Sequence, residues 1–403
     1  MGLDEAELIV GALRHSRRAA IPVVGFLESA GARLQDGAAA LDGFGRIFSE
    51  NVALSGHEPQ ISVITGTAAG GGCYSPALTD FVVMSDGSSM FLTGPKIVKH
   101  ALGEDVSSGE LGGVGVHQQN GVCDFVVADD SEAISLVREL LSYLPQNALE
   151  TPPPRRSEPP LDGTDPAGPL PDRTRSFYDV RDVIRRLVDA GRFLEVSPRW
   201  ARNMVAGFAR LDGHAIAIIA NQARYLGGII DVTGSQKGAR FVRTCDAFGL
   251  PLLVLVDTPG FMPGTHQEQA GVIRHGAELV RAFAAATSPR ATVILRKAFG
   301  GAFITMNSKG LGADATFTWP DAEIGVMSAG AAVEIIHHRQ LRAARLGTST
   351  AEQLAGRYAE EHLSAQAALR RGAIHAVIEP HETRRRVAEV LLGSRIAPRL
   401  GAR

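Results

Sequence analysis

The sequence predicts an α/β protein made of two homologous domains, each with a largely parallel sheet covered by helices. Three observations lead to this prediction. Short apolar runs alternate with helical patterns, one Pro-rich segment divides the chain, and parts of the two halves match each other at a nearly constant offset. At 403 residues, the chain also exceeds the length at which a single hydrophobic core stops growing, so two domains are expected.

Strands are predicted where short runs are continuously apolar, because the strands of a parallel sheet are buried on both faces. These runs are residues 21–26, 61–66, 81–84, 215–220, 251–257 and 291–295. Helical patterns lie between them, including residues 37–54, 131–144 and 271–287. Strands that alternate with helices indicate βαβ units.

The composition changes sharply over residues 151–175, which are rich in proline, glycine and charged residues. Such a segment does not form a packed helix or strand. We therefore predict a linker there, between a first domain at residues 1–150 and a second domain at residues 176–403.

The two halves share one order of strand, turn and helix. The predicted strand that starts at Pro22 matches the one at Pro251, at an offset of 229 residues. The next apolar strand ends in Gly70-Gly71-Gly72 in the first half and in Gly300-Gly301-Ala302 in the second, at an offset of 230 residues. We infer that the chain holds two copies of one α/β unit.

The repeated glycine turn is a candidate anion site. A helix that starts directly after a buried strand presents unpaired backbone N–H groups, and its dipole adds positive potential. Small residues allow an oxygen to approach the main chain within about 3 Å. The predicted donors are the N–H groups of Gly70 and Gly71 and those of Gly301 and Ala302. Close helix packing is the alternative explanation, and the duplication makes it less attractive.

Bulk properties exclude several classes of function. The formal net charge of -2 gives no general attraction to nucleic acids or anionic membranes. No apolar run approaches the roughly 20 residues of a membrane span, and the acidic N-terminus is unlike a secretory signal, so we expect a cytoplasmic protein. Cys73, Cys123 and Cys245 are expected to be buried small residues rather than disulfide or zinc ligands.

Motifs for side-chain nucleophiles, phosphate loops, zinc proteases and dinucleotide binding are missing from the sequence. We predict no metal. Stabilisation of an enolate by backbone donors remains, as reactions next to a thioester carbonyl require. Two such sites suggest two carbonyl groups to polarise.

Several long motifs point to one family. The first half carries GTAAGGGCYSPALTDFVVM (66–84), FLTGPKIVKHALGEDV (91–106), ELGG (110–113) and LLSYLPQN (140–147), and the second carries long motifs over 234–280 and 296–327. These motifs resemble the carboxyltransferase (β) subunits of biotin-dependent acyl-CoA carboxylases, such as acetyl- and propionyl-CoA carboxylase. The resemblance implies a duplicated crotonase-like fold, usually in a hexameric ring.

The resemblance also implies roles for the glycine turns. Gly70 and Gly71 would hold the thioester oxygen of acyl-CoA on the first domain. Gly301 and Ala302, after Gly300, would hold the ureido oxygen of carboxybiotin, which is bound to the second domain of a neighbouring subunit. Carboxylate would pass to the alpha carbon and give malonyl-CoA or methylmalonyl-CoA. Biotin would arrive on a separate carrier, from a biotin carboxylase and biotin carboxyl carrier (α) subunit.

Two positions near the second turn have open interpretations. The resemblance places Ile304 in the wall of the acyl pocket, where some relatives carry Asp, but plain packing is the alternative. Arg296 and Lys297 precede the turn, where they would add positive potential or form solvated or intersubunit charges.

The sequence departs from the family in its first half. Family members carry a further segment before the point where this sequence starts, without which sheet edges would need another cover. Glu28 and Ala30 stand where the family tends to have Asp and Gly, and Asp124 stands where it tends to have His. Two other functions therefore stay open: a biotin-independent decarboxylase or acyl-transfer enzyme, and a non-catalytic subunit of a mixed ring.

Overall fold

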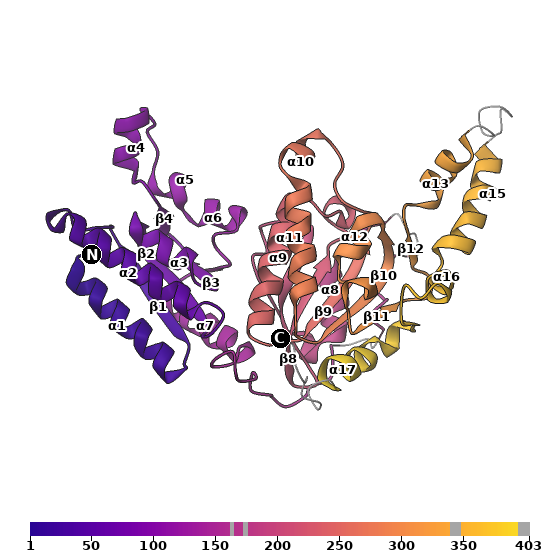
Figure 1. The fold of residues 1–403 in the computed structure, drawn as a ribbon, viewed down its shortest axis with the longest axis horizontal. Helices are drawn as coiled ribbons and strands as arrows, with labels where there is room; N and C mark the ends of the chain where they lie inside the picture. The colour runs from indigo at the N-terminus through magenta and orange to yellow at the C-terminus, as the bar shows by residue number, and fades with distance from the viewer. Residues whose placement is uncertain (162–164, 172–175, 339–347, 394–403) are drawn as a thin grey trace. The chain divides into compact units, whose positions relative to one another are not determined.

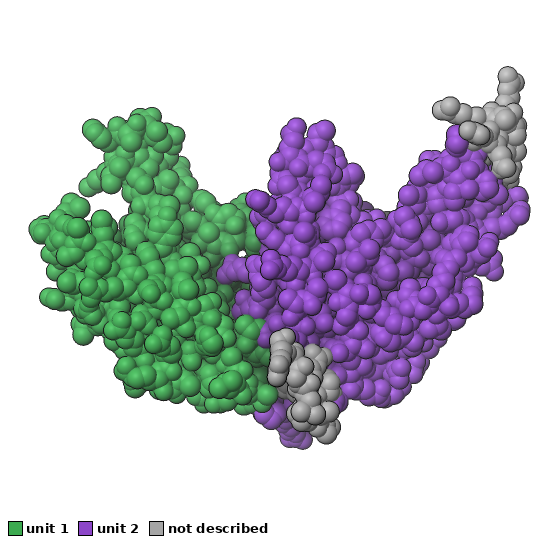
Figure 2. Space-filling model, viewed as in Figure 1, with its two compact units in different colours: residues 1–153, 196–200, 247–249 green, residues 154–195, 201–246, 250–403 purple. Residues whose placement is uncertain are grey.

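The computed structural model describes residues 1–161, 165–171, 176–338 and 348–393. The chain divides into two compact units (Figure 2). Unit 1 comprises Met1–Pro153, Val196–Trp200 and Ala247–Gly249, and unit 2 comprises Pro154–Glu195, Ala201–Asp246 and Leu250–Arg403. The described residues between 151 and 175 form neither helix nor strand.

Unit 1 is built on a parallel sheet with the order β1-β2-β3-β5, in which β4 also pairs with β2. Its strands are β1 (Val23–Ser29), β2 (Gln60–Ala69), β3 (Phe81–Ser85), β4 (Ser89–Phe91) and β5 (Phe125–Val127). Its helices are α1 (Leu3–Ala19), α2 (Ala38–Leu54), α3 (Gly71–Ala77), α4 (Pro95–Leu102), α5 (Ser108–Gly112), α6 (Val114–Asn120) and α7 (Asp130–Tyr143).

Unit 2 has a longer sheet with the order β13-β11-β10-β9-β8-β7-β6, in which β12 also pairs with β10. Its strands are β6 (Phe193–Glu195), β7 (Met204–Leu211), β8 (His214–Asn221), β9 (Leu252–Thr258), β10 (Arg290–Phe299), β11 (Ala315–Thr318), β12 (Glu323–Gly325) and β13 (Ala376–Val377). Its described helices are α8 (Val180–Leu187), α9 (Val232–Ala247), α10 (Thr265–Gln269), α11 (Val272–Ala285), α12 (Gly300–Thr305), α13 (Ala329–Ile336), α15 (Thr348–Tyr358), α16 (Ala365–Arg370) and α17 (Thr383–Gly393).

The internal repeat is visible in the strand order. The path β1-β2-β3-β5 with β4 on β2 corresponds strand for strand to β9-β10-β11-β13 with β12 on β10. Unit 2 continues this path beyond β9 through β8, β7 and β6, of which the β8–β7 and β7–β6 pairs are antiparallel. Helices flank both sheets (Figure 1). The predicted α/β class with largely parallel, helix-covered sheets is thus confirmed.

One predicted strand differs in its burial. Residues 21–26 were expected to be buried on both faces, yet β1 alternates between half-buried and exposed positions, and Phe26 is 48% exposed. The reason is position, because β1 ends the described strand order of its sheet. Its counterpart β9 lies between β8 and β10 and is buried along its whole length.

Each sheet contains a bulge just before its glycine turn. In β10 the register moves from Ile294 opposite Val256 to Ala298 opposite Thr258, so residues 295–297 face Asp257 alone. In β2 residues 65–67 face Glu28 in the same way. Beyond the bulge each strand leaves its earlier neighbour, β11 or β3, and pairs with the short strand β12 or β4. The bulge therefore redirects the strand toward the helix that follows.

Equivalent side chains in the two units form hydrogen bonds with the start of β3 and the start of β11. Asp124 is buried and accepts hydrogen bonds from the N–H of Val82 (3.0 Å) and the hydroxyl of Ser197 (2.8 Å). In unit 2 the Nδ1 atom of His375 accepts the N–H of Thr316 (2.9 Å). Asp124 therefore does in unit 1 what a histidine does in unit 2. This departure from the family pattern preserves a structural hydrogen bond.

We predict that Asp124→Ala will lower the free energy of unfolding by about 2–3 kcal/mol, because two buried donors lose their acceptor. Urea unfolding followed by circular dichroism measures this change. Asp124→His should lose much less, since an imidazole fills the equivalent position in unit 2. Equal losses in the two variants would contradict the proposed equivalence.

Candidate active site

The first glycine of each turn has the same φ angle. Gly70 lies between β2 and α3 with φ of 59°, and Gly300 directly follows β10 with φ of 59°. A side chain is strained in this left-handed region, so glycine is needed at both positions. The turn lets α3 and α12 start within one residue of the strands that precede them.

The predicted N–H donors differ in whether they already have a hydrogen-bond acceptor. The N–H of Gly70 already donates to the carbonyl oxygen of Phe91 at 3.0 Å, which the sequence did not indicate. Gly71 lies in the first turn of α3, and Gly301 and Ala302 lie in the first turn of α12, where the helix provides no acceptor for the N–H groups. In unit 1, Gly71 is therefore the freer of the two predicted donors.

The surroundings of the corresponding glycines also differ. A Cβ atom on Gly71 would lie 2.7 Å from the ring of Phe44, so this residue is small because an aromatic ring packs on it. A Cβ atom on Gly301 would lie 3.7 Å from the ring of Phe261, which is an ordinary contact. Packing explains the glycine at position 71 but not the one at position 301.

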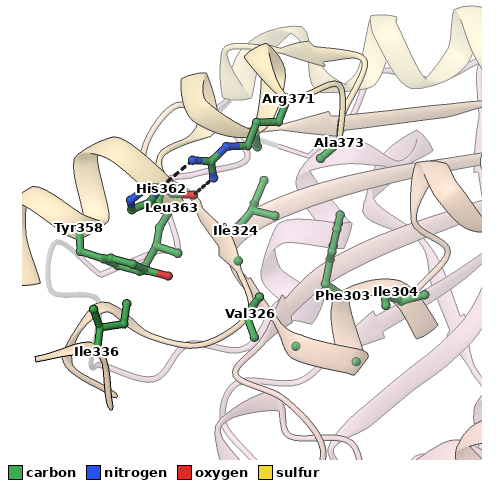
Figure 3. A pocket seen from close by; sticks show the side chains of 14 residues that line it. Phe303, Ile304, Ile324, Val326, Ile336, Tyr358, His362, Leu363, Arg371 and Ala373 are labelled. Atoms are coloured by element: carbon green, nitrogen blue, oxygen red, sulfur yellow. Dashed lines mark hydrogen bonds between the residues drawn. The ribbon is translucent and has the colours of Figure 1, made fainter. Parts of the chain in front are cut away.

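Gly301 opens into a cavity of unit 2 that has a volume of about 780 Å³ (Figure 3). Gly300, Gly301 and Ile304 all line it, and Ile304 is 53% exposed. The rest of the lining is mainly apolar and comes from Phe303, Ile324, Gly325, Val326, Ile336, Tyr358, Leu363, Ala368 and Ala373, with His362 and Arg371 as polar members. Arg371 is held by His362, to whose carbonyl oxygen it donates at 3.1 Å.

The other predicted site residues do not line this cavity. The methyl group of Ala302 is fully buried in the core, so only its backbone is available. In unit 1, a cavity of about 480 Å³ is lined by Gly72, Ser29 and Phe44 but by neither Gly70 nor Gly71. The C-terminal residues around the unit 2 cavity, such as Tyr358 and Arg371, were not predicted, because no local motif marks them.

Arg296 and Lys297 are neither solvated nor free in unit 2. Their side chains are 8% and 22% exposed and lie beside the fully buried Asp257, with Arg296 Nη2 3.1 Å and Lys297 Nζ 4.0 Å from its carboxylate oxygens. Burial raises the pKa of Asp257, while the cations Arg296 and Lys297 oppose that rise. Burial likewise lowers the pKa of Lys297, against the attraction of Asp257.

The described cysteines and metal-ligating side chains form no further candidate site. Cys73, Cys123 and Cys245 are free and buried, as predicted, and burial raises the pKa of Cys123 to about 12. Within the described ranges, no cluster of three or more His, Cys, Asp or Glu residues has the placement of a metal site. None of the described helices has the length and apolarity needed to cross a membrane.

Comparisons with known proteins agree with one another. The carboxyl transferase domain family matches residues 2–393. The carboxyltransferase subunit of propionyl-CoA carboxylase from Haloferax mediterranei is 47% identical over 388 residues, which are 95% of this chain and 75% of that protein. Methylmalonyl-CoA decarboxylase subunit alpha from Propionigenium modestum is 42% identical over 96% of this chain and 76% of its own length.

A solved structure extends this similarity to the whole described fold. The crystal structure of transcarboxylase 12S, a hexamer assembly with methylmalonyl-coenzyme A and methylmalonic acid bound, has a TM-score of 0.95 and 40% sequence identity. The match covers 100% of this chain and 78% of the 12S chain. This chain therefore belongs to the carboxyl transferase family and is an enzyme of the acyl-CoA carboxylase carboxyltransferase type with a duplicated crotonase-like fold.

Proposed function

We propose that this enzyme transfers carboxylate from carboxybiotin to the alpha carbon of a short acyl-CoA. The products would be methylmalonyl-CoA from propionyl-CoA or malonyl-CoA from acetyl-CoA. The main support is the repeat of strand, bulge, glycine turn and helix, which gives the chain two sets of backbone donors. Two carbonyl oxygens need stabilisation in this reaction, one on the thioester and one on the ureido ring.

Unit 2 suits the biotin side. Gly301 is exposed at the cavity and has no packing reason to be glycine, so an oxygen has room to approach its N–H. Ala302 would add a second N–H donor from a backbone that its buried methyl group holds in place. The apolar lining excludes water and strengthens both hydrogen bonds. Carboxybiotin, when bound, supplies the carboxylate and then a ring nitrogen that accepts the alpha proton.

Unit 1 suits the thioester side. The N–H of Gly71 would carry most of the stabilisation of the enolate oxygen, because Gly70 shares its N–H with Phe91. Phe44 packs against Gly71 and limits how far the turn can move. Donors that are already oriented stabilise developing charge without reorganisation.

Partners and location follow from the same assignment. We propose a homo-oligomeric ring, because the 12S relative forms a hexamer, and a separate α subunit that carries biotin. The three free, buried thiols fit a reducing compartment, which supports a cytoplasmic location.

A second function has specific support. Relatives named methylmalonyl-CoA decarboxylase subunit alpha are 42% identical to this chain. Loss of carbon dioxide from methylmalonyl-CoA generates the same enolate, so the donors of unit 1 would serve either direction. The two functions are separated by whether biotin is required in the reaction.

We predict that Gly301→Val will lower biotin-dependent decarboxylation of methylmalonyl-CoA by about 100-fold, because a branched side chain narrows the approach to one oxyanion donor. Gly301→Ala should give a smaller loss. Steady-state assays with free biotin and the purified enzyme measure both rates. The KM for the thioester should stay within about twofold, since the donors of unit 1 are unchanged.

The choice of Gly301 keeps this experiment independent of folding. Gly71→Val would drive a side chain into Phe44, so its loss of activity would not separate chemistry from stability. Urea unfolding of Gly301→Val should remain close to that of the natural protein. Turnover that needs no biotin and is unchanged in Gly301→Val would favour the decarboxylase function instead.

We also predict that Ile304→Ala will shift acyl preference toward longer chains, because in the proposed reaction the alpha carbon must reach carboxybiotin at the glycine turn of unit 2, and Ile304 lines the cavity beside that turn. A difference of one methylene group in an apolar pocket changes the ratio of kcat/KM for two substrates by about 10-fold or more. The ratio of kcat/KM for butyryl-CoA and acetyl-CoA measures the shift. Ile273→Ala, at an exposed apolar residue of the same unit outside this cavity, is the matched control and should leave the ratio unchanged.

A further inference from the structure

The bulge of β10 contains two charged residues, Arg296 and Lys297. Residues 295–297 lie opposite Asp257, directly before the segment that leads into Gly300 and Gly301. At this point β10 stops pairing with β11 and begins pairing with β12. An interaction that fixes the bulge therefore also fixes the direction of the segment that follows.

A buried ion pair holds the bulge. Arg296 donates through Nε to one carboxylate oxygen of Asp257 at 3.1 Å, its Nη2 lies 3.1 Å from the same oxygen, and the carboxylate is fully buried. The Nη1 atom of Arg296 donates to the carbonyl oxygen of Ser176 at 2.7 Å, and its guanidinium lies 5.2 Å from the ring centre of Tyr178. The pair therefore ties β9 and β10 to the chain segment that precedes α8.

The carboxylate is also held through its own backbone. The N–H of Asp257 donates to Asn221 Oδ1 at 3.3 Å, across the neighbouring strand β8. A Cβ atom on Gly228 would lie 2.2 Å from the carbonyl oxygen of Asp257, so the chain passes over this residue at close range. Asp257 is therefore a fixed anchor, and a bond to it restrains the bulge.

Unit 1 shows that the fold does not require this pair. Its bulge places Gly66 and Thr67 opposite Glu28, at the positions that correspond to Arg296, Lys297 and Asp257. The Glu28 side chain lies over Gly66, where a Cβ atom would be 2.5 Å from its carboxylate carbon. The same bulge forms there with no cation in it. Because burial of an ion pair is costly, its presence in unit 2 alone points to the site of unit 2.

We propose that Asp257 and Arg296 are positioning residues, which hold the β10 bulge so that the N–H groups of Gly301 and Ala302 keep their orientation toward a bound oxyanion. This inference rests on the proposed function, because it concerns the donors assigned to the biotin side. Lys297 is 4.0 Å from the carboxylate and only adds charge to the cluster. Its removal should leave the geometry intact.

Kinetics of three variants separate geometry from charge. Asp257→Asn removes the ion pair and should lower kcat for biotin-dependent decarboxylation of methylmalonyl-CoA by about 10- to 100-fold, as expected for a small misplacement of donors. The KM for the thioester should stay within about twofold. Lys297→Met should keep kcat within about threefold. The double variant Asp257→Asn with Lys297→Met restores the net charge of the cluster and should remain as slow as Asp257→Asn.

A second ion pair in the same unit supplies the matched control. Asp189 is also buried and pairs with Arg384 at 2.6 Å, but it lies opposite no part of the glycine turn. Asp189→Asn should destabilise the enzyme to urea yet leave kcat unchanged. A loss of kcat in Asp189→Asn equal to that in Asp257→Asn would overturn the proposal, as would full recovery in the double variant.

Hydrogen exchange tests the geometry without turnover. The peptide that covers residues 298–306 should exchange faster in Asp257→Asn than in the natural protein, and at the natural rate in Asp189→Asn and Lys297→Met. Unchanged exchange in Asp257→Asn would overturn the positioning role even if activity fell. If the natural enzyme showed no biotin-dependent turnover, the proposed function would fail, and the exchange result would still decide whether this pair holds the turn.

Discussion

The rest of the structure depends on one backbone constraint, the passage from a buried parallel strand to a helix within a single residue. A glycine with positive φ makes this passage possible, and a bulge three residues earlier aims the strand at it. Together they expose N–H groups that a continuing strand would have paired with its neighbour. Because the protein supplies no acceptor for these N–H groups, an oxygen atom of the substrate can accept their hydrogen bonds.

Much of this architecture was predictable because it is encoded locally. Apolar runs marked β2, β3, β8, β9 and β10, and the offset between the halves marked the duplication. The short strands β4 and β12 were not predicted, because three residues carry no periodic signal. The exposure of β1 was also missed, since an apolar run does not reveal whether a strand lies inside a sheet or at its end.

The candidate site was also predictable only in part. The glycine turns and Ile304 were found from sequence, because small residues after an apolar run are a local pattern. The engagement of Gly70 by Phe91 depends on β4, a strand that sequence did not reveal. The partner of Arg296 is Asp257, 39 residues away, and only the fold brings them together. A comparison of the repeats at positions 28 and 257 would have drawn attention to this residue.

The bulge has a consequence for how such an enzyme changes during evolution. Backbone donors cannot be replaced by mutation, so a site made from them has few ways to vary. The bulge adds a position whose side chain is free to vary, glycine in one copy and arginine in the other, while the main chain keeps the same path. After a duplication, each copy can therefore acquire its own electrostatic character, and two sites that began alike can specialise for different substrates.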